Sequence, residues 1–147
     1  MILENEIWKD IKDYEGLYQV SNLGRVKSVA RTIDTTFKGK PIKRQVFEKI
    51  LKTATYCYGY KYVCLSKDCK AKKCKVHRLV AGTFLENTNN YPVINHKDGN
   101  KLNNNVDNLE WCTYKENAIH AVKTGLYDLE HLRKPRKKRC DKEWKDI

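Results

Sequence analysis

Residues 93–120 read VINHKDGNKLNNNVDNLEWCTYKENAIH, and this stretch decides the fold of the later part of the chain. A short apolar strand, Val93-Ile94, leads to Asn95-His96. Residues 97–108 are rich in asparagine and contain one glycine, which is typical of an ordered loop. Residues 109–112, LEWC, read as a returning strand. We therefore predict a strand, an Asn-rich loop and a second strand.

A helix is predicted directly after this hairpin. Thr113 followed three residues later by Glu116 is a capping box, and Gly125 ends the helix just after Lys123. Residues three and four apart share a helix face, so Thr113 and the polar pair Asn117-His120 lie on one side. If that side packs against the hairpin, the pair can face Asn95-His96.

These residue types suit phosphodiester hydrolysis. His96 has the ordinary pKa of a base that can deprotonate an attacking water at neutral pH. Amide oxygens such as those of Asn95 and Asn117 can hold a divalent cation, which would stabilise the phosphate and the leaving 3′ oxygen. Taken alone, His96 would be read as a hydrogen-bonded loop histidine, but the surrounding pattern favours catalysis.

The earlier part of the chain reads as β-rich. Alternating residues 17–20 and 25–29 flank the turn Asn22-Leu-Gly24, which predicts a hairpin with Trp8, Tyr14 and Tyr18 packed behind it. Residues 31–43 are polar and are predicted to form a mobile loop. Further strands are expected at 45–52, 58–66 and 73–76, followed by a short helix over 77–84.

Two motifs carry a resemblance to a known family. Residues 93–104, 108–113 and Glu116-Asn117 resemble the HNH homing endonucleases of phages and mobile introns. Residues 8–28, containing WKDI and YEGLYQVSNLGRVKS, resemble the NUMOD-type motif that often precedes that module, and residues 77–84 resemble the helix that leads into it. The match covers roughly residues 6–124, with both motifs in the family's order.

The resemblance implies an α+β fold with a ββα-metal module. Its expected organisation is a NUMOD-type DNA-binding region over 1–72, the HNH nuclease module over 73–125 and a basic, disordered tail over 126–147. The implied roles are general base for His96, Mg²⁺ or Mn²⁺ ligands for Asn95 and Asn117, and support of the loop for Asn108. His120 either touches the scissile phosphate or makes a packing contact.

One departure from the family bears on the mechanism. Several members have Asp where this chain has Asn95, and a hard cation prefers charged oxygen ligands. Either a DNA phosphate completes the site, or Asp98 helps, or activity is reduced. The last possibility leaves a second hypothesis, a catalytically impaired DNA-binding protein that keeps the HNH fold.

The charge balance predicts the partner. A formal net charge of +12 and a pI near 9.4 favour a polyanion, so double-stranded DNA is the expected partner of a monomeric protein. A β-hairpin can enter a major groove. Basic residues cluster in the amino-terminal half of the chain, and most members of this cluster are predicted to contact DNA. The cluster also contains Lys38 and Lys40. In full, the predicted DNA contacts are Arg25, Lys27, Arg31, Lys43, Arg44, His77 and Arg78, with a packing role as the alternative for His77.

Six cysteines raise a third hypothesis, a zinc-stabilised RNA- or protein-binding module. The chain has no Cys-x-x-Cys pair, so reduced, buried or half-buried thiols are the preferred interpretation. No apolar run approaches the ~20 residues of a membrane span, and the first ten residues do not resemble a signal peptide. A cytoplasmic protein of a bacterial or phage-infected host is expected, without a membrane partner.

Overall fold

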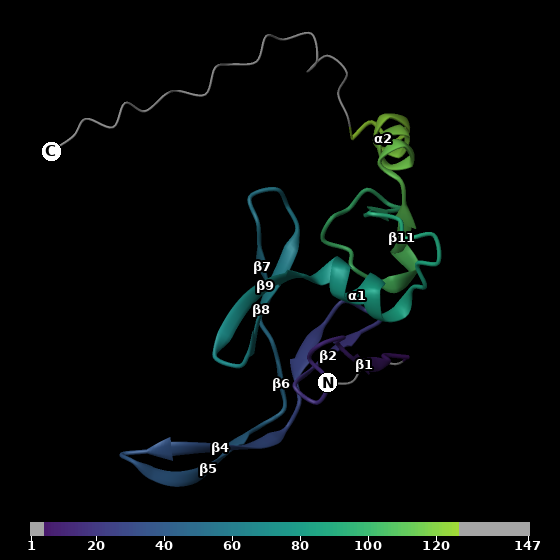
Figure 1. Ribbon diagram of the computed structural model, residues 1–147. Coiled ribbons are helices and arrows are strands. Elements are labelled where there is room, and N and C mark those ends of the chain that lie inside the picture. Colours follow the sequence, from purple (N-terminus) through teal and green to yellow (C-terminus); the bar gives the residue numbers. More distant parts are fainter. Residues whose placement is uncertain (1–4, 127–147) are drawn as a thin grey trace, which may run out of the picture.

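The computed structural model describes residues 5–126 and contains four small antiparallel sheets and two α-helices (Figure 1). The first sheet has the order β1-β2-β3-β6, the second pairs β4 with β5, the third has the order β7-β8-β9, and the fourth pairs β10 with β11. The α+β class expected from the sequence is confirmed. In chain order the elements are β1 Trp8–Asp10, β2 Tyr18–Ser21, β3 Val26–Ser28, β4 Arg31–Phe37, β5 Lys40–Val46, β6 Lys49–Ile50, β7 Ala54–Thr55, β8 Lys61–Lys67, β9 Lys70–Lys75, α1 Val76–Phe84, β10 Val93–His96, a 3-10 turn Val106–Asn108, β11 Leu109–Cys112 and α2 Tyr114–Lys123.

The hydrophobic core joins the two halves of the chain through α1. This helix lies against β2, β8, β9, β10 and β11, and it occupies the centre of the molecule (Figure 1). Fully buried side chains come from β2, β3, β8, β11 and α1: Val20, Val26, Val63, Leu65, Val76, Val80 and Leu109. Because early strands and the β10–β11 hairpin share one core, the position of each constrains the other.

The predicted hairpin of β2 and β3 is confirmed. Val20 and Val26 are paired in register and both are buried, as their alternating pattern requires. Behind them, Tyr14 and Tyr18 make an edge-to-face contact with ring centroids 5.9 Å apart. Trp8 lies on β1, opposite Ser21.

Residues 31–43 are not the loop that the sequence predicts, because most of them belong to the paired strands β4 and β5. Four of the seven residues of β4 are the β-branched Thr32, Ile33, Thr35 and Thr36, which favour extended backbone. Lys38 and Gly39 both have positive φ, as a two-residue hairpin turn requires. This hairpin, hereafter the β4–β5 arm, extends away from the rest of the molecule (Figure 1) and contributes no side chain to the core.

Two further strand boundaries differ from expectation. The strand expected over 45–52 is divided between the end of β5 and the short β6, and the one expected over 58–66 begins only at Lys61. The β8–β9 hairpin forms, with its turn at Asp68-Cys69 in the positive-φ region.

The expectation that the thiols are buried is wrong for three of the five described cysteines. Cys57, Cys64 and Cys69 are exposed, whereas Cys112 is buried and Cys74 is half-buried. Strand parity explains Cys64, because Val63 and Leu65 take the inward face of β8. Nor do three His, Cys, Asp or Glu side chains gather as a metal site anywhere in residues 5–126, so the described part of the chain offers no zinc site.

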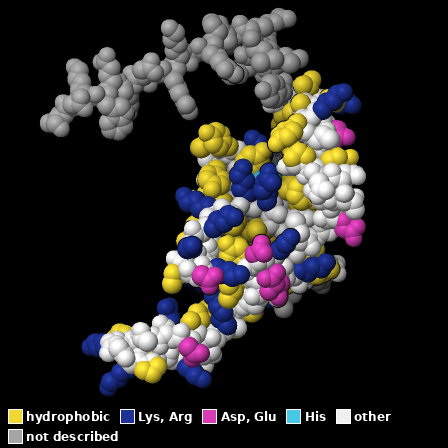
Figure 2. All heavy atoms as spheres, viewed as in Figure 1, with side chains coloured by type: hydrophobic (Ala, Val, Ile, Leu, Met, Phe, Trp, Pro, Cys, Tyr) yellow, Lys and Arg dark blue, Asp and Glu magenta, His cyan; other side chains and the backbone are white. Residues whose placement is uncertain are grey.

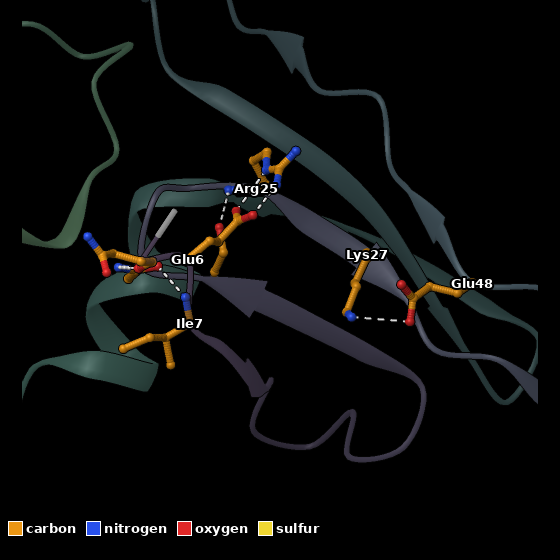
Figure 3. A network of polar contacts seen from close by, with 8 residues as sticks. Glu6, Ile7, Arg25, Lys27 and Glu48 are labelled. Carbon is orange, nitrogen blue, oxygen red and sulfur yellow. Dashed lines mark hydrogen bonds and ion pairs between the residues drawn. The ribbon is translucent and has the colours of Figure 1, made fainter. Parts of the chain in front are cut away.

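Polar contacts fix the start of the described chain against the first sheet (Figure 3). Arg25 forms an ion pair with Glu6, and its Nε donates to Glu6 Oε1 at 2.7 Å. The Ile7 amide donates to Asn22 Oδ1 at 2.8 Å, while Lys27 pairs with Glu48 at 3.1 Å.

The turn between β2 and β3 also contacts the Asn-rich loop. The Val106 amide donates to Asn22 O at 2.8 Å. At Gly24, a Cβ atom would lie 2.8 Å from Asn104 Cβ and 3.0 Å from its carbonyl oxygen. Only glycine permits so close an approach, and Gly24 also has a φ of +81°.

In the described residues no helix has the length and hydropathy needed to cross a membrane. Nearly all of the predicted basic tail, from residue 127 onward, lies outside the described residues.

We predict that Gly24→Ala destabilises the protein by about 2–3 kcal/mol, because the positive φ strains alanine by ~1 kcal/mol and the backbone of Asn104 must also move. Gly16→Ala is the matched control, since Gly16 has a φ of +68° but no heavy atom within 4 Å of an added Cβ. That variant should lose only about 1 kcal/mol. Urea unfolding of both measures the difference, and equal losses would show that the contact with Asn104 has no energetic weight.

Candidate active site

The β10–β11 hairpin and α2 form the strand–loop–strand–helix unit that the sequence predicts. His96 ends β10 opposite Leu109, and only 5% of its surface is exposed. At the start of α2 the capping box is present in full, with the Glu116 amide donating to Thr113 Oγ1 and the Thr113 amide donating to Glu116 Oε2. This cap fixes where α2 begins, and the helix lies beside β10.

The Asn-rich loop is organised around the carboxylate of Asp98. It accepts hydrogen bonds from the Asn100 amide at 2.7 Å, Asn103 Nδ2 at 2.8 Å and Asn108 Nδ2 at 2.9 Å. These donors, with Asn103 foremost, lower the pKa of Asp98. Asn108 also accepts from the Asp98 amide, so it ties the end of the loop to its beginning. That its role is to keep His96 aimed stays a prediction.

His96 is held by Asn104, a residue that the sequence analysis did not single out. His96 Nε2 lies 3.2 Å from Asn104 Oδ1, while Asn104 Nδ2 donates to Leu102 O. An amide oxygen can only accept, so Nε2 carries the proton of the neutral ring and Nδ1 keeps its lone pair. Burial lowers the pKa of His96, against the opposing effect of the Asn104 hydrogen bond, and therefore favours this neutral form.

A second buried imidazole lies beside His96. The ring centroids of His77 and His96 are 5.3 Å apart, and Tyr60 packs against both. Burial, followed by the neighbouring His96, lowers the pKa of His77 to about 3. His77 is thus a neutral side chain with only 5% exposure, which does not suit the predicted phosphate contact and favours the alternative packing role.

Helix α2 contributes Asn117 and His120 to the same region. His120 Nε2 lies 3.0 Å from the carbonyl oxygen of Lys97, the residue that follows His96. This contact holds α2 against the end of β10. Asn117 is half-buried one turn earlier, on the same face. Within residues 5–126, no hydrogen bond joins its side chain to Asn95 or His96.

Asn95 has a defined orientation. Its Nδ2 donates to Glu110 Oε1 at 2.8 Å, which leaves Oδ1 without a donor in the described part of the chain. Amide oxygens are hard ligands, so Asn95 and Asn117 fit a cation such as Mg²⁺ that keeps several waters and shares a substrate phosphate. They fit less well as a complete protein cage, because neither carries a charge.

The basic side chains predicted to contact DNA differ in whether they already pair with groups of the protein. Arg25 and Lys27 are paired with acids, as described above, and both lie over the Trp8 ring. Arg31 donates to the carbonyls of Leu17 and Val29. By contrast, Lys43, Arg44 and Arg78 remain exposed, although Arg78 Nη2 donates to Pro92 O at 3.4 Å. Figure 2 shows Lys and Arg side chains along the whole visible face, including the β4–β5 arm.

Sequence reasoning missed three residues of this region: Tyr60, Asn104 and Glu110. The sequence contained a signal for Glu110, because pairing the two predicted strands in register places Glu110 opposite Asn95. Asn104 stands in a run of three asparagines, and nothing in the sequence distinguishes it from its neighbours.

Comparison with known families agrees with the geometry of the two halves. The profile described as HNH endonuclease matches residues 74–119, and the NUMOD4 motif matches residues 6–66. The first match contains β10, β11 and most of α2, and the second contains the first sheet and the β4–β5 arm. The resemblance found in the sequence is therefore confirmed.

Individual relatives carry the same names. DNA endonuclease I-HmuI of Bacillus phage SP01 is 41% identical over 122 residues, which cover 83% of this chain and 61% of the relative. An uncharacterized HNH endonuclease of Acanthamoeba polyphaga mimivirus is 56% identical over 66 residues, 45% of this chain and 20% of the relative. The chain thus spans less than two thirds of either protein's length.

A solved structure is also similar. It is described as DNA binding and cleavage by the HNH homing endonuclease I-HmuI, and it matches with a TM-score of 0.68 and 39% sequence identity. The match covers 86% of this chain and 64% of that chain.

We expect acid to destabilise the protein through His77. The unfolded imidazole takes up a proton below its ordinary pKa of ~6.5, whereas the folded one resists protonation until about pH 3, so stability falls as pH drops through this window. The loss attributable to His77 is about 2 kcal/mol between pH 7 and pH 5. Urea unfolding of wild type and His77→Phe in EDTA tests this: the variant should lose the part of the pH dependence due to His77 and keep the part due to His96, while the two curves run parallel between pH 7 and 9. Identical acid sensitivity would contradict the assignment.

Proposed function

We propose that the chain is an HNH endonuclease, as the match of residues 74–119 to that family indicates, and that it is a metal-dependent, homing-type enzyme that cleaves double-stranded DNA. The observation that best supports the proposal is the state of His96. It is a buried, neutral imidazole whose Nε2 is held by Asn104, so its Nδ1 lone pair is available as a base.

The proposed reaction is hydrolysis of a phosphodiester. His96 Nδ1 accepts a proton from a water molecule, the water oxygen attacks phosphorus, and the bond from phosphorus to the 3′ oxygen breaks. The leaving 3′ oxygen takes a proton from solvent. The depressed pKa of His96 keeps the ring unprotonated at neutral pH, which is the form that a base requires.

Asn95 Oδ1 and Asn117 are the proposed ligands of Mg²⁺ or Mn²⁺. A bound divalent cation would supply charge stabilisation for the phosphate and the leaving oxygen. The chain's own part is to hold two amide oxygens on adjacent elements, one on β10 and one on α2. His120 contacts Lys97 O through Nε2, which supports the packing alternative for this residue rather than a phosphate contact.

One such site cuts one strand at a time, so we expect a monomer that nicks DNA more readily than it breaks both strands. An enzyme of this type would act in the cytoplasm of a bacterial or phage-infected host. The second candidate is a catalytically impaired DNA-binding protein with the same fold. Its support is the uncharged Asn95, at the position where the family resemblance leads us to expect Asp in several members.

The β4–β5 arm is the proposed major-groove element. Cross-strand register places Arg44 opposite Ile33 and Lys40 opposite Phe37, all on one face of the arm, because every second residue of a strand shares a face. Lys43 lies on the other face, directly opposite Asp34, whose charge offsets its own. We therefore propose that the Arg44 face meets DNA, where exposed Ile33, Phe37 and Ile42 could contact thymine methyl groups.

His96→Ala should lower nicking of supercoiled plasmid by at least about 100-fold, because it removes the base and leaves the cation ligands in place. DNA affinity measured in EDTA should stay unchanged, which separates loss of chemistry from loss of binding. Full activity in this variant would remove His96 from the mechanism. If wild type leaves plasmids of many sequences intact with either Mg²⁺ or Mn²⁺, the impaired-protein candidate is preferred.

Arg44→Gln should weaken DNA binding and reduce the slope of log affinity against log salt by about 1, as expected for one lost phosphate contact. Lys43→Gln is the matched control on the opposite face and should change the slope less. Filter binding between 50 and 300 mM salt, roughly the range where such slopes are measured, reports both values. A larger effect for Lys43→Gln would reverse the assigned face.

A further inference from the structure

Glu110 is a carboxylate in direct contact with Asn95, one of the proposed cation ligands. It lies on β11 directly opposite Asn95 on β10, and paired residues of antiparallel strands project to the same face. Its Oε1 accepts the 2.8 Å hydrogen bond from Asn95 Nδ2. Because a carboxylate only accepts, this bond prevents the Asn95 amide from turning its oxygen toward Glu110.

Two other acids of the module, Asp98 and Glu116, are already engaged in hydrogen bonds. Asp98, the carboxylate that the sequence suggested as a helper, accepts three hydrogen bonds within the Asn-rich loop. Glu116 accepts from the amide and hydroxyl of Thr113 in the capping box. Moving either one to the cation site would dismantle the loop or the cap.

The charge of Glu110 has no basic partner. Among residues 5–126 the two salt bridges involve Glu6 and Glu48, and neither includes Glu110. Glu110 also lines a surface hollow of about 270 Å³ whose other lining residues include no Lys or Arg. A half-buried carboxylate in a protein of net charge +12 would ordinarily pair with a basic side chain. Within residues 5–126, however, the side chain of Glu110 accepts a hydrogen bond only from the Asn95 amide, and this arrangement calls for an explanation.

We propose that Glu110 is a positioning residue that replaces, one strand away, the negative charge missing at Asn95. The inference rests on the proposed function. Glu110 orients Asn95 Oδ1 toward the cation, and the charged hydrogen bond polarises the amide so that its oxygen becomes a stronger ligand. The negative charge also attracts the cation at short range.

Glu110→Gln separates charge from shape. The substituted amide oxygen can still accept from Asn95 Nδ2, so orientation is kept while the charge is removed. Changing residues that orient metal ligands typically weakens metal affinity 10- to 100-fold, so we expect Mn²⁺ to bind about tenfold more weakly. Asn95→Asp/Glu110→Gln should restore binding, because it moves the carboxylate to the ligand position and leaves a hydrogen-bond donor opposite it.

The experiment titrates Mn²⁺ into the full chain bound to a short DNA duplex and measures free Mn²⁺ by electron paramagnetic resonance. The Mn²⁺ concentration for half-maximal plasmid nicking is the second readout, and thermal melting in EDTA is the third. Glu86→Gln is the matched control, since Glu86 lines the same hollow without contacting Asn95. Melting should be unchanged in both single variants.

Each outcome decides the proposal. Wild-type nicking with an unaltered Mn²⁺ dependence in Glu110→Gln would overturn the role of Glu110 and leave the proposed function intact. Absence of nicking in wild type would instead count against the proposed function, and the resonance titration would then judge Glu110 alone. Equal Mn²⁺ binding by all variants, no binding by wild type, or loss of binding only together with a lowered melting temperature would overturn the proposal.

Discussion

The approach of the Gly24 turn to Asn104 is the contact on which the candidate site depends. Asn104 Oδ1 contacts Nε2 of His96. The backbone of Asn104 packs so closely against Gly24, in the turn between β2 and β3, that no side chain larger than hydrogen fits there. A feature of the first sheet thus fixes a side chain of the β10–β11 module from outside that module. The Val106 amide, bonded to Asn22 O, reinforces the same junction. This explains why the two sequence motifs form one core: the first positions the loop that positions the imidazole.

Burial of His96 and His77 together has an electrostatic consequence. Two imidazoles with ring centroids 5.3 Å apart cannot both be charged cheaply in a water-poor environment, and His96 accordingly lowers the pKa of His77. His77 takes the larger shift because burial acts on it without an opposing hydrogen bond; its Nδ1 has no partner in the described residues. The net effect is that His96 stays neutral, and nearby positive charge such as that of Lys101 acts in the same direction.

The sequence predicted the parts of the molecule where local rules are strong. The capping box of α2, the alternation in β2 and β3, and the spacing of α1 each correspond to one dominant interaction, and these elements formed as expected. The β4–β5 arm was missed because its strands contribute no side chain to the core and polar residues interrupt their apolar pattern. Threonine content and a two-residue turn stabilise them instead. For the candidate site, the sequence predicted roles for Asn95, His96 and Asn117, which stay predictions, and it did not single out Asn104. Which asparagine in a run meets an imidazole depends on how the loop folds around Asp98, a tertiary property that residue identity does not encode.

The arm that projects from the body has a consequence for how such a protein could change over generations. Its side chains stabilise no interior packing, and Phe37 near its tip is 61% exposed, so substitutions there carry little thermodynamic penalty for the scaffold. Mutational freedom is therefore concentrated in the segment proposed to meet nucleic acid and is low around the buried imidazoles. Related proteins could therefore acquire new DNA preferences through substitutions in the β4–β5 arm, while the residues around the buried imidazoles stay unchanged.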